Sequence, residues 1–242
     1  MKRHNHYVVI LILFISMGVF PQTLQVGGGL GTAIPGDDYS GSTIDFFNGE
    51  KYGMGNAFNM HAKARVGLPG FSFFGMIDYS TFSGEGEGEP GRGTVENTHK
   101  IFSLKVGPEF NFSILVIPFG FYFDAFLSMN TISGTVSFQG LTQVPSGSYD
   151  LETSTRFGAG AGGGVLITIF PLVKLDLGVH YNSYNAFGKE YNSGGEGPGR
   201  LEVYTSLNDE KDPLYNTDSD HIVGEARTLE AWHYTVTVMF GI

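Results

Sequence analysis

Eight charged residues stand at alternating positions in otherwise apolar stretches, where ion pairing or gated ion passage is the available chemistry. The bases are Lys63, Arg65, Lys105 and Lys174, and the acids are Asp78, Glu109, Asp124 and Asp176. If the face that carries them is enclosed, an unpaired charge is costly, so we expect a paired, hydrogen-bonded network. The alternative is a gate, in which exchange of ion-pair partners opens a narrow water path for small ions.

Three histidines, His61, His180 and His233, share this polar face, and Asp176 precedes His180 by four residues. A carboxylate beside an imidazole suits acid–base catalysis. Residues i and i+4 of one strand lie ~13 Å apart, however, so these two cannot touch along the strand. The sequence contains no G-x-S-x-G or H-E-x-x-H motif. We therefore predict no enzyme, and no catalytic, cofactor-binding or metal-binding residue.

Acidic residues crowd two further segments, 84–97 and 187–228. Oxygen-rich clusters of this kind can bind Ca²⁺, but the spacing of an EF-hand loop is missing and glycine separates the glutamates. We interpret both segments as a solvated surface that faces outward.

The elements that must position these residues are strands, because apolar and polar side chains alternate with period two. The last residues, 234–242, show the pattern best. We predict eight strands, at roughly 23–33, 56–68, 71–83, 98–113, 117–131, 154–169, 172–186 and 229–242. Each is long enough to cross the hydrocarbon layer at a tilt, for which ~9–11 residues are needed.

Short and long connections alternate along the chain. The short ones are 69–70, 113–116 and 170–171, and the long, polar ones are 34–55, 84–97, 132–153 and 187–228. In an up-and-down barrel this alternation places every long loop at one end, as in outer-membrane barrels. Segment 187–228 is too long for a structureless connection. We predict that it extends the last two strands, or short strands beside them, as a hairpin; an irregular lid is the alternative.

The orientation of the two faces separates a membrane barrel from a soluble one. A lipocalin-like binder would enclose the apolar face, and a membrane barrel turns that face to lipid. Four glycines share the polar face of one strand: Gly158, Gly160, Gly162 and Gly164. Inside a barrel of eight strands such a track leaves room for larger polar side chains, which favours the membrane orientation. Glycines that merely bend the strand are the other interpretation.

Aromatic residues near the predicted strand ends suit the two membrane interfaces. We assign Tyr181, Tyr184, Trp232 and Tyr234 to the outer girdle, and Phe71, Phe119 and Phe240 to the periplasmic one.

Composition agrees with this interpretation. The 242 residues include 36 glycines and 14% aromatic but only 16% charged residues, and there is no cysteine. Segment 1–22 resembles a secretory signal, with Lys2 and Arg3 before the apolar stretch 7–20. The remainder, 23–242, is predicted to be a single barrel domain. It is strongly acidic and has no basic cluster, which excludes a typical nucleic-acid-binding protein.

These features together resemble the small outer-membrane β-barrel proteins of the OmpA/OmpX type, over residues 23–242. The family usually ends on an aromatic residue, whereas this chain ends at Ile242, two residues after Phe240. The resemblance implies an all-β, eight-stranded antiparallel up-and-down transmembrane barrel. It also implies a monomer in the outer membrane of a Gram-negative-type bacterium, in contact with lipid and lipopolysaccharide and inserted by the barrel-assembly machinery.

The expected role is structural or surface-interactive, carried by the long loops and an unknown extracellular partner. The alternatives are a narrow pore or small-solute conduit, and a soluble lipocalin-like binder. Some eight-stranded outer-membrane barrels modify lipid A, which would make the protein an enzyme.

Overall fold

The computed structural model describes residues 23–68, 70–113, 118–192, 200–215 and 220–241. The predicted signal segment 1–22 lies outside these residues, as do the turn residues 69 and 114–117.

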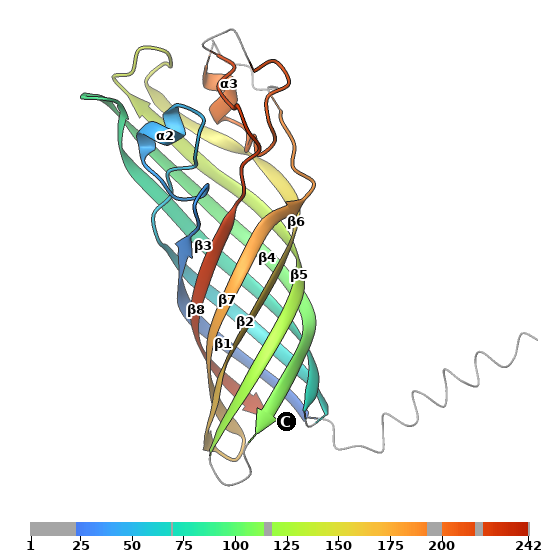
Figure 1. Ribbon diagram of the computed structural model, residues 1–242. Coiled ribbons are helices and arrows are strands. Elements are labelled where there is room, and N and C mark those ends of the chain that lie inside the picture. The colour runs from blue at the N-terminus through green and yellow to red at the C-terminus, as the bar shows by residue number, and fades with distance from the viewer. Residues whose placement is uncertain (1–22, 69, 114–117, 193–199, 216–219, 242) are drawn as a thin grey trace, which may run out of the picture.

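Eight antiparallel strands close into one barrel, which confirms the predicted fold class (Figure 1). They are β1 (Thr23–Pro35), β2 (Ala57–Leu68), β3 (Phe71–Glu89), β4 (Arg92–Ser113), β5 (Phe119–Gln139), β6 (Gly147–Phe170), β7 (Val173–Phe187) and β8 (Glu230–Gly241). Each strand pairs with its neighbour in sequence, and β1 pairs with β8 to close the ring, from Gln25 opposite Gly241 to Pro35 opposite Ala231. Two short helices, α2 (Thr43–Phe47) and α3 (Leu201–Tyr204), lie at one end, opposite the C-terminal end of β8.

The exterior of the barrel is apolar and the interior is polar over the half nearer the chain ends. In β5, Phe121, Phe123 and Leu127 are exposed, while Tyr122 and Asp124 between them are buried. Side chains of a strand alternate between faces, so this half has the polarity of a lipid-embedded barrel. The interpretation as a soluble binder with an apolar interior is therefore wrong.

Four strands are longer than predicted, because the polarity of their faces reverses part of the way along. The outward apolar side chains of β3 to β6 end at Ile77, Phe102, Met129 and Phe157. Beyond this level large apolar residues appear on the inward face, beside the polar Asn97 and His99 of β4. In β5 the apolar residues are Ile132, Val136 and Phe138, which are buried. A strand that leaves lipid for water must hide its apolar side from the water, which reverses the alternation.

The region beyond this level, which we call the head, comprises 36–56, 82–100, 132–155 and the described residues of 188–229. Segments 36–56, 200–215 and 220–229 fold over the inner face of the extended strands, and α2 packs against β3 and β4. Two clusters of buried apolar residues fill the space between them, one including Tyr39, Phe82 and Leu207, the other Phe47 and Phe138. The head is therefore a water-surrounded core built on the barrel rim.

The prediction of a hairpin in 187–228 is wrong. β7 ends at Phe187, β8 begins at Glu230, and Leu201–Tyr204 forms the short helix α3 instead of a strand. Leu201, Val203 and Tyr204 are all buried, since this segment packs inward on the head core instead of projecting. The projecting hairpins are formed by β3 with β4 and by β5 with β6. Among the described residues, no helix has the length and hydropathy to cross a membrane.

Candidate functional site: the filled lumen and the head

The lumen nearest the short turns is occupied by two bases and two acids that contact one another. Lys63 Nζ lies 3.2 Å from Glu109 and 3.1 Å from Asp176, and Arg65 lies 2.5 Å and 3.1 Å from the same two carboxylates. The Tyr122 hydroxyl donates to Asp176 at 2.7 Å. All five side chains are buried. Charges removed from water in this way are stable only when paired and hydrogen-bonded, as they are here.

A second group of charges lies further toward the head. Lys105 Nζ is 3.3 Å from Asp78, which also accepts a hydrogen bond of 2.7 Å from the Asn59 amide. His180 Nε2 lies 3.0 Å from Asp124. Lys105 and Asp78 stand on the neighbouring strands β4 and β3, and His180 of β7 reaches Asp124 of β5 over Gly162 of β6. These contacts therefore join neighbouring parts of the barrel wall.

The structure places all eight predicted charges on the inner face. All of them except Asp124 and Lys174 form ion pairs with one another, and Asp124 lies beside His180. Lys174 is half-buried near the turn end and makes no ion pair with any described residue. We call the eight the lumen network: Lys63, Arg65, Asp78, Lys105, Glu109, Asp124, Lys174 and Asp176.

Asp176 and His180 do not contact each other, as expected from their spacing along one strand. His180 contacts Asp124 of β5, and Asp176 contacts Lys63 and Arg65. His61 bonds to Thr237 at 2.7 Å. These rings are buried in the lumen wall, out of reach of a substrate.

The glycine track of β6 gives room to large inward side chains. A Cβ on Gly160 would lie 2.3 Å from the Phe126 ring, and one on Gly164 would lie 2.7 Å from the Tyr122 ring. These rings lie in turn beside the cations: Lys63 Nζ is 4.4 Å from the centre of Tyr122, and Lys105 Nζ is 5.5 Å from that of Phe126. Because Gly160 and Gly164 have no side chain, the rings of Phe126 and Tyr122 can lie beside the bases of the lumen.

Little free space is left between these groups. The lumen cavity lined by Asp78, Lys105, Phe126 and His233 has a volume of about 10 Å³, enough for about one water molecule. The described lumen is a packed interior.

A buried carboxylate, Asp209, helps to fasten the head to the barrel. It accepts hydrogen bonds from Arg156 of β6 (2.9–3.2 Å), from the Asn185 amide of β7 (2.8 Å) and from the backbone N–H of Glu190 (3.0 Å). Charge-assisted bonds with a guanidinium are the strong kind. Asp209 therefore joins the segment before β8 to two strands on the barrel rim.

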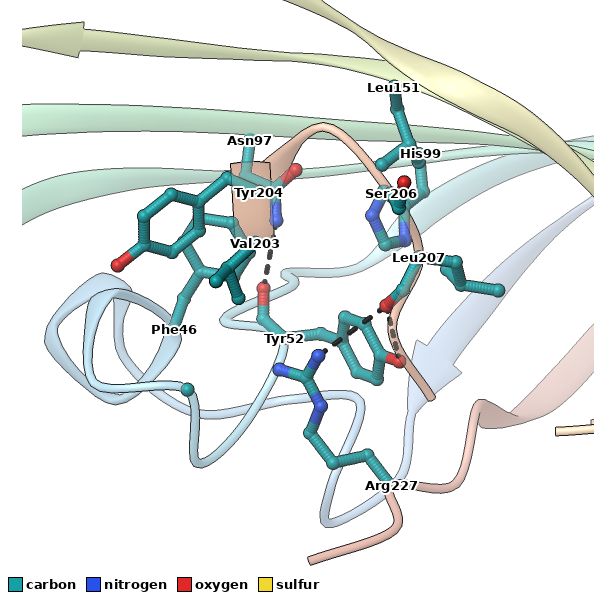
Figure 2. Close-up of a pocket in the computed structure, with 11 residues that line it drawn as sticks. Phe46, Tyr52, Asn97, His99, Leu151, Val203, Tyr204, Ser206, Leu207 and Arg227 are labelled. Atoms are coloured by element: carbon teal, nitrogen blue, oxygen red, sulfur yellow. Dashed lines mark hydrogen bonds between the residues drawn. The ribbon is translucent and has the colours of Figure 1, made fainter. Parts of the chain in front are cut away.

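Arg227 connects the two folded segments of the head (Figure 2). Its guanidinium lies 4.2 Å from the ring centre of Tyr52 and donates to the carbonyl of Asn208 at 2.6 Å. The Tyr52 hydroxyl donates to the Leu207 carbonyl at 3.1 Å, and Asn97 donates to the Tyr52 carbonyl at the same distance. The cavity among these residues also measures about 10 Å³, so this part of the head is closed as tightly as the lumen. A larger, polar cavity of about 190 Å³ lies beside it, lined by Arg156, Glu190 and Asn208 among others.

His99 and Asp212 are among the groups of the head whose pKa departs from its ordinary value. Burial, reinforced by the charge of Arg227, lowers the pKa of His99 to about 3. Burial raises the pKa of Asp212, but hydrogen bonds from Tyr191, from the Leu214 backbone and from His221 outweigh it and leave that pKa below its usual value. Both groups depend on the head remaining folded.

Of the seven aromatic residues assigned to the two girdles, six lie on the outer surface and one lies inside the barrel. Trp232, Tyr234, Phe71, Phe119 and Phe240 are exposed on the outer surface. Tyr181 is half-buried there, its ring 5.3 Å from that of Trp232 and its hydroxyl bonded to Glu230.

The assignment of Tyr184 to the girdle is wrong. Tyr184 is 1% exposed and its hydroxyl lies 2.5 Å from His233 Nε2 inside the barrel. It follows Tyr181 by three residues, and residues an odd number apart in a strand point to opposite faces.

Sequence reasoning missed Arg156, Asn185, Asp209 and Arg227, which hold the head together. Asp209 was seen only as one of many acids in 187–228. The usable signal was the reversal of alternation in 131–138, which indicates a second, water-surrounded core. No group of three His, Cys, Asp or Glu side chains that could hold a metal ion occurs among the described residues.

Comparison with known proteins gives matches only at the level of structure. No protein-family model matches the chain, and no curated protein does. Among solved structures, a major outer membrane protein of Thermus thermophilus is 13% identical with a TM-score of 0.50, covering 91% of this chain and 99% of that one. Neisserial surface protein A is 16% identical with a TM-score of 0.46, covering 90% and 96%.

Ail of Yersinia pestis, solved with the heparin analogue sucrose octasulfate, is 10% identical with a TM-score of 0.41, covering 91% and 97%. The likeness to the Thermus structure shows the fold. With its apolar belt and polar lumen, the chain is an eight-stranded β-barrel of the outer-membrane type.

Proposed function

We propose that the protein is a closed outer-membrane scaffold that holds an ordered, acidic head at the cell surface for interaction with a partner. One observation carries the proposal: the barrel is filled at two levels, by the lumen network and by the folded loops above it. The role is non-enzymatic, because the histidines and carboxylates of the lumen are buried where no substrate can approach.

A conduit requires a continuous wet path, which this packing does not provide. The cavity beside Lys105 in the lumen holds about one water molecule, and so does the cavity beside Tyr52 that lies in the head. The larger cavity of the head, beside Arg156 and Asn208, lies above the lumen network. An ion moving through would have to leave its hydration shell while the lumen charges already satisfy one another. A rigid barrel with a fixed head suits presentation of a surface instead.

Planar-bilayer recording of the refolded chain tests this proposal. We expect no conductance from the wild type, and none from Lys105→Ala. Steady single-channel currents from the wild type would overturn the proposal in favour of a conduit. The matched control is a refolded porin, which shows that the bilayer reports open barrels.

Single cysteines test where the head lies, since the chain has none of its own. A membrane-impermeant maleimide should label Thr94→Cys on intact cells, because Thr94 is exposed in the head. Ser103→Cys, which is fully buried in the lumen, should stay unlabelled until the protein is denatured. Labelling of Thr94→Cys only after the outer membrane is opened would contradict a surface-exposed head.

A gated pore is the second candidate, favoured by one feature of the network. Lys63 and Arg65 each contact both Glu109 and Asp176, so the pairs could exchange partners at little cost. Conductance that is absent in the wild type and present in Lys105→Ala would support this gate.

A further inference from the structure

The four longest strands continue past the apolar belt as a sheet with one covered and one open face. We call the open face of 83–87, 94–100, 133–139 and 148–150 the outer sheet. Glu85 pairs with Glu96, Glu96 with Ser137, and Ser137 with Ser148, so the four strands lie in register. Figure 1 shows the two hairpins rising beyond the rest of the barrel wall.

The covered face fixes the position of the outer sheet. Val95, Val136 and Phe138 on this face are buried against Phe47 and Tyr204 of the two folded segments. The sheet is therefore backed by a packed core, and a partner that docks on its open side meets a preformed surface.

The open face is polar and carries a net negative charge. Its described strands expose no large apolar side chain. The residues that point outward are Ser83, Glu85, Glu87, Thr94, Glu96, Thr98, Lys100, Ser133, Thr135, Ser137, Gln139, Ser148 and Asp150. Lys100 is the one base among them, against four acids, and no ion pair joins it to them.

Two of the acids stand directly opposite each other. Glu85 and Glu96 are cross-strand partners on β3 and β4, and like charges in this position destabilise a sheet. The neighbouring glycine has a packing reason, because a Cβ on Gly84 would lie 1.9 Å from the carbonyl of Gly53 on the covered side. No packing requirement explains Glu85 and Glu96, because they point to the open face, where any polar residue would fit.

We propose that the outer sheet docks a basic protein surface, rich in Lys and Arg, by charge complementarity. The inference rests on the proposed function and specifies its partner class. An incoming cation pairs with Glu85 and Glu96 and removes their mutual repulsion. Binding is therefore favoured by an electrostatic attraction that replaces a repulsion in the free protein. Hydroxyl groups of the flanking Ser and Thr residues supply hydrogen bonds around the charges.

The size of the face sets the expected affinity. Four strands at ~4.8 Å spacing and about six residues of ~3.3 Å rise give a face of roughly 15 by 20 Å. Contacts of this size belong to weak, transient complexes. Binding should therefore be rapid, weak and strongly reduced by salt, because exposed charges are screened within ~8 Å at physiological ionic strength.

The test uses the refolded full chain in zwitterionic micelles, with cytochrome c as a folded basic probe at 20 and 150 mM NaCl. Fully acetylated cytochrome c, which lacks the lysine charges, is the negative probe. The outer-sheet variant is Glu85→Gln with Glu96→Gln. The control variant, Glu50→Gln with Glu225→Gln, removes the same charge from exposed head residues off this face. Heat-modifiable gel mobility confirms that each variant folds.

We expect the outer-sheet variant to raise the Kd at least five-fold and the control variant less than two-fold. Equal weakening by both variants would mean that overall charge, not this face, attracts the probe, and would overturn the inference. So would wild type that binds neither probe, or that binds both equally. Stoichiometric Ca²⁺ binding that the outer-sheet variant alone loses would reassign the face to a metal ion and likewise overturn it.

Failure here is distinguishable from failure of the proposed function. A barrel that conducts no ions and labels at Thr94→Cys, yet binds no cytochrome c, keeps the scaffold proposal and loses only this partner class.

Discussion

The lumen network and the head are built on the same strands with opposite polarity. In β4, below Phe102, the inward residues are Ser103, Lys105 and Glu109, and the outward ones are apolar. Above it, Ile101 and Val95 point inward. The medium outside decides this difference: lipid forces polar groups inward, and water forces apolar groups inward.

The two regions also treat charge differently. The lumen network contains four bases and four acids, and its ion pairs are dry. Every other acid among the described residues belongs to the head or its boundary, where acids outnumber bases. An unpaired charge is costly inside a packed barrel and nearly free on a wetted surface, so only the head can carry the net charge.

The largest effect should come from breaking the lumen network. Glu109→Ala leaves Lys63 and Arg65 with Asp176 as their shared carboxylate, and loss of one partner of a buried pair costs about 3–5 kcal/mol. Urea unfolding of the refolded barrel in vesicles, followed by gel mobility, measures this loss. Glu210→Ala, at an exposed head position, is the control and should change stability little. Equal losses would mean that the network contributes no more than a surface charge.

The head should unfold locally when the charge of Asp209 is removed. Asp209→Asn keeps the size of the side chain but removes the charge that holds Arg156, and bonds to a charged group contribute about 1.5–3 kcal/mol. Hydrogen exchange should rise in 200–229 while β1 to β3 keep their protection. If the whole barrel loosens together, the head and lumen are one cooperative unit and the comparison fails.

The glycine track tests packing in the lumen without altering charge. Gly160→Val places a side chain against the Phe126 ring and within 2.4 Å of the Tyr181 carbonyl, and should cost about 1–3 kcal/mol. Gly28→Val is the control, because a Cβ there meets nothing closer than 3.7 Å on the lipid side. The control should be neutral or slightly stabilising. The same unfolding assay compares the two.

Acidification should loosen the head through His99. Its folded pKa of about 3 lies below the unfolded value near 6.5, so between these values the unfolded chain binds more protons. Stability is complete above pH ~6.5 and falls as the pH drops toward 3, by at most about 1.4 kcal/mol per pH unit. The amide protection factors of 36–56, which correct the exchange rate for its own dependence on pH, should fall between pH 7.5 and 5, because Tyr39 of this segment bonds to His99.

His99→Gln is the matched variant for this prediction, because an amide keeps a hydrogen-bonding group and does not titrate. Its amide protection factors in 36–56 should be the same at both pH values. Asp212 contributes to stability in a lower pH range. Its folded pKa lies below the ordinary carboxyl value, so its stabilisation is lost only as the pH falls through that folded pKa.

The smallest effect should be a gain. Glu96→Gln removes the like-charge pair with Glu85 and should stabilise the head by about 0.2–1 kcal/mol, measured by hydrogen exchange in 82–100. Glu225→Gln should give no gain. A loss of stability in Glu96→Gln would mean that the opposed carboxylates are favourable as they stand.

Periodicity was sufficient to predict the barrel, because the side-chain period of two and the alternation of short and long connections are properties of the sequence. It also placed Lys63, Arg65 and their partners on a common face. It could not predict which acid meets which base, because Arg65 and Asp176 are far apart in the chain and meet only when β2 and β7 face each other across the lumen. The conformation of 187–228 could not be predicted for a similar reason. Leu201 and Tyr204 fit a strand locally, but their burial depends on packing against Phe47 and Phe138, which come from other segments.

The sequence by itself determined the eight strands, their order and the lipid-facing side, since alternation and turn residues act locally along the chain. It even contained the reversal between Met129 and Ile132 that marks where lipid ends. The tertiary structure alone decided how the lumen is neutralised and how the head closes. Ion pairing and core packing depend on distances between segments that only the closed barrel brings together.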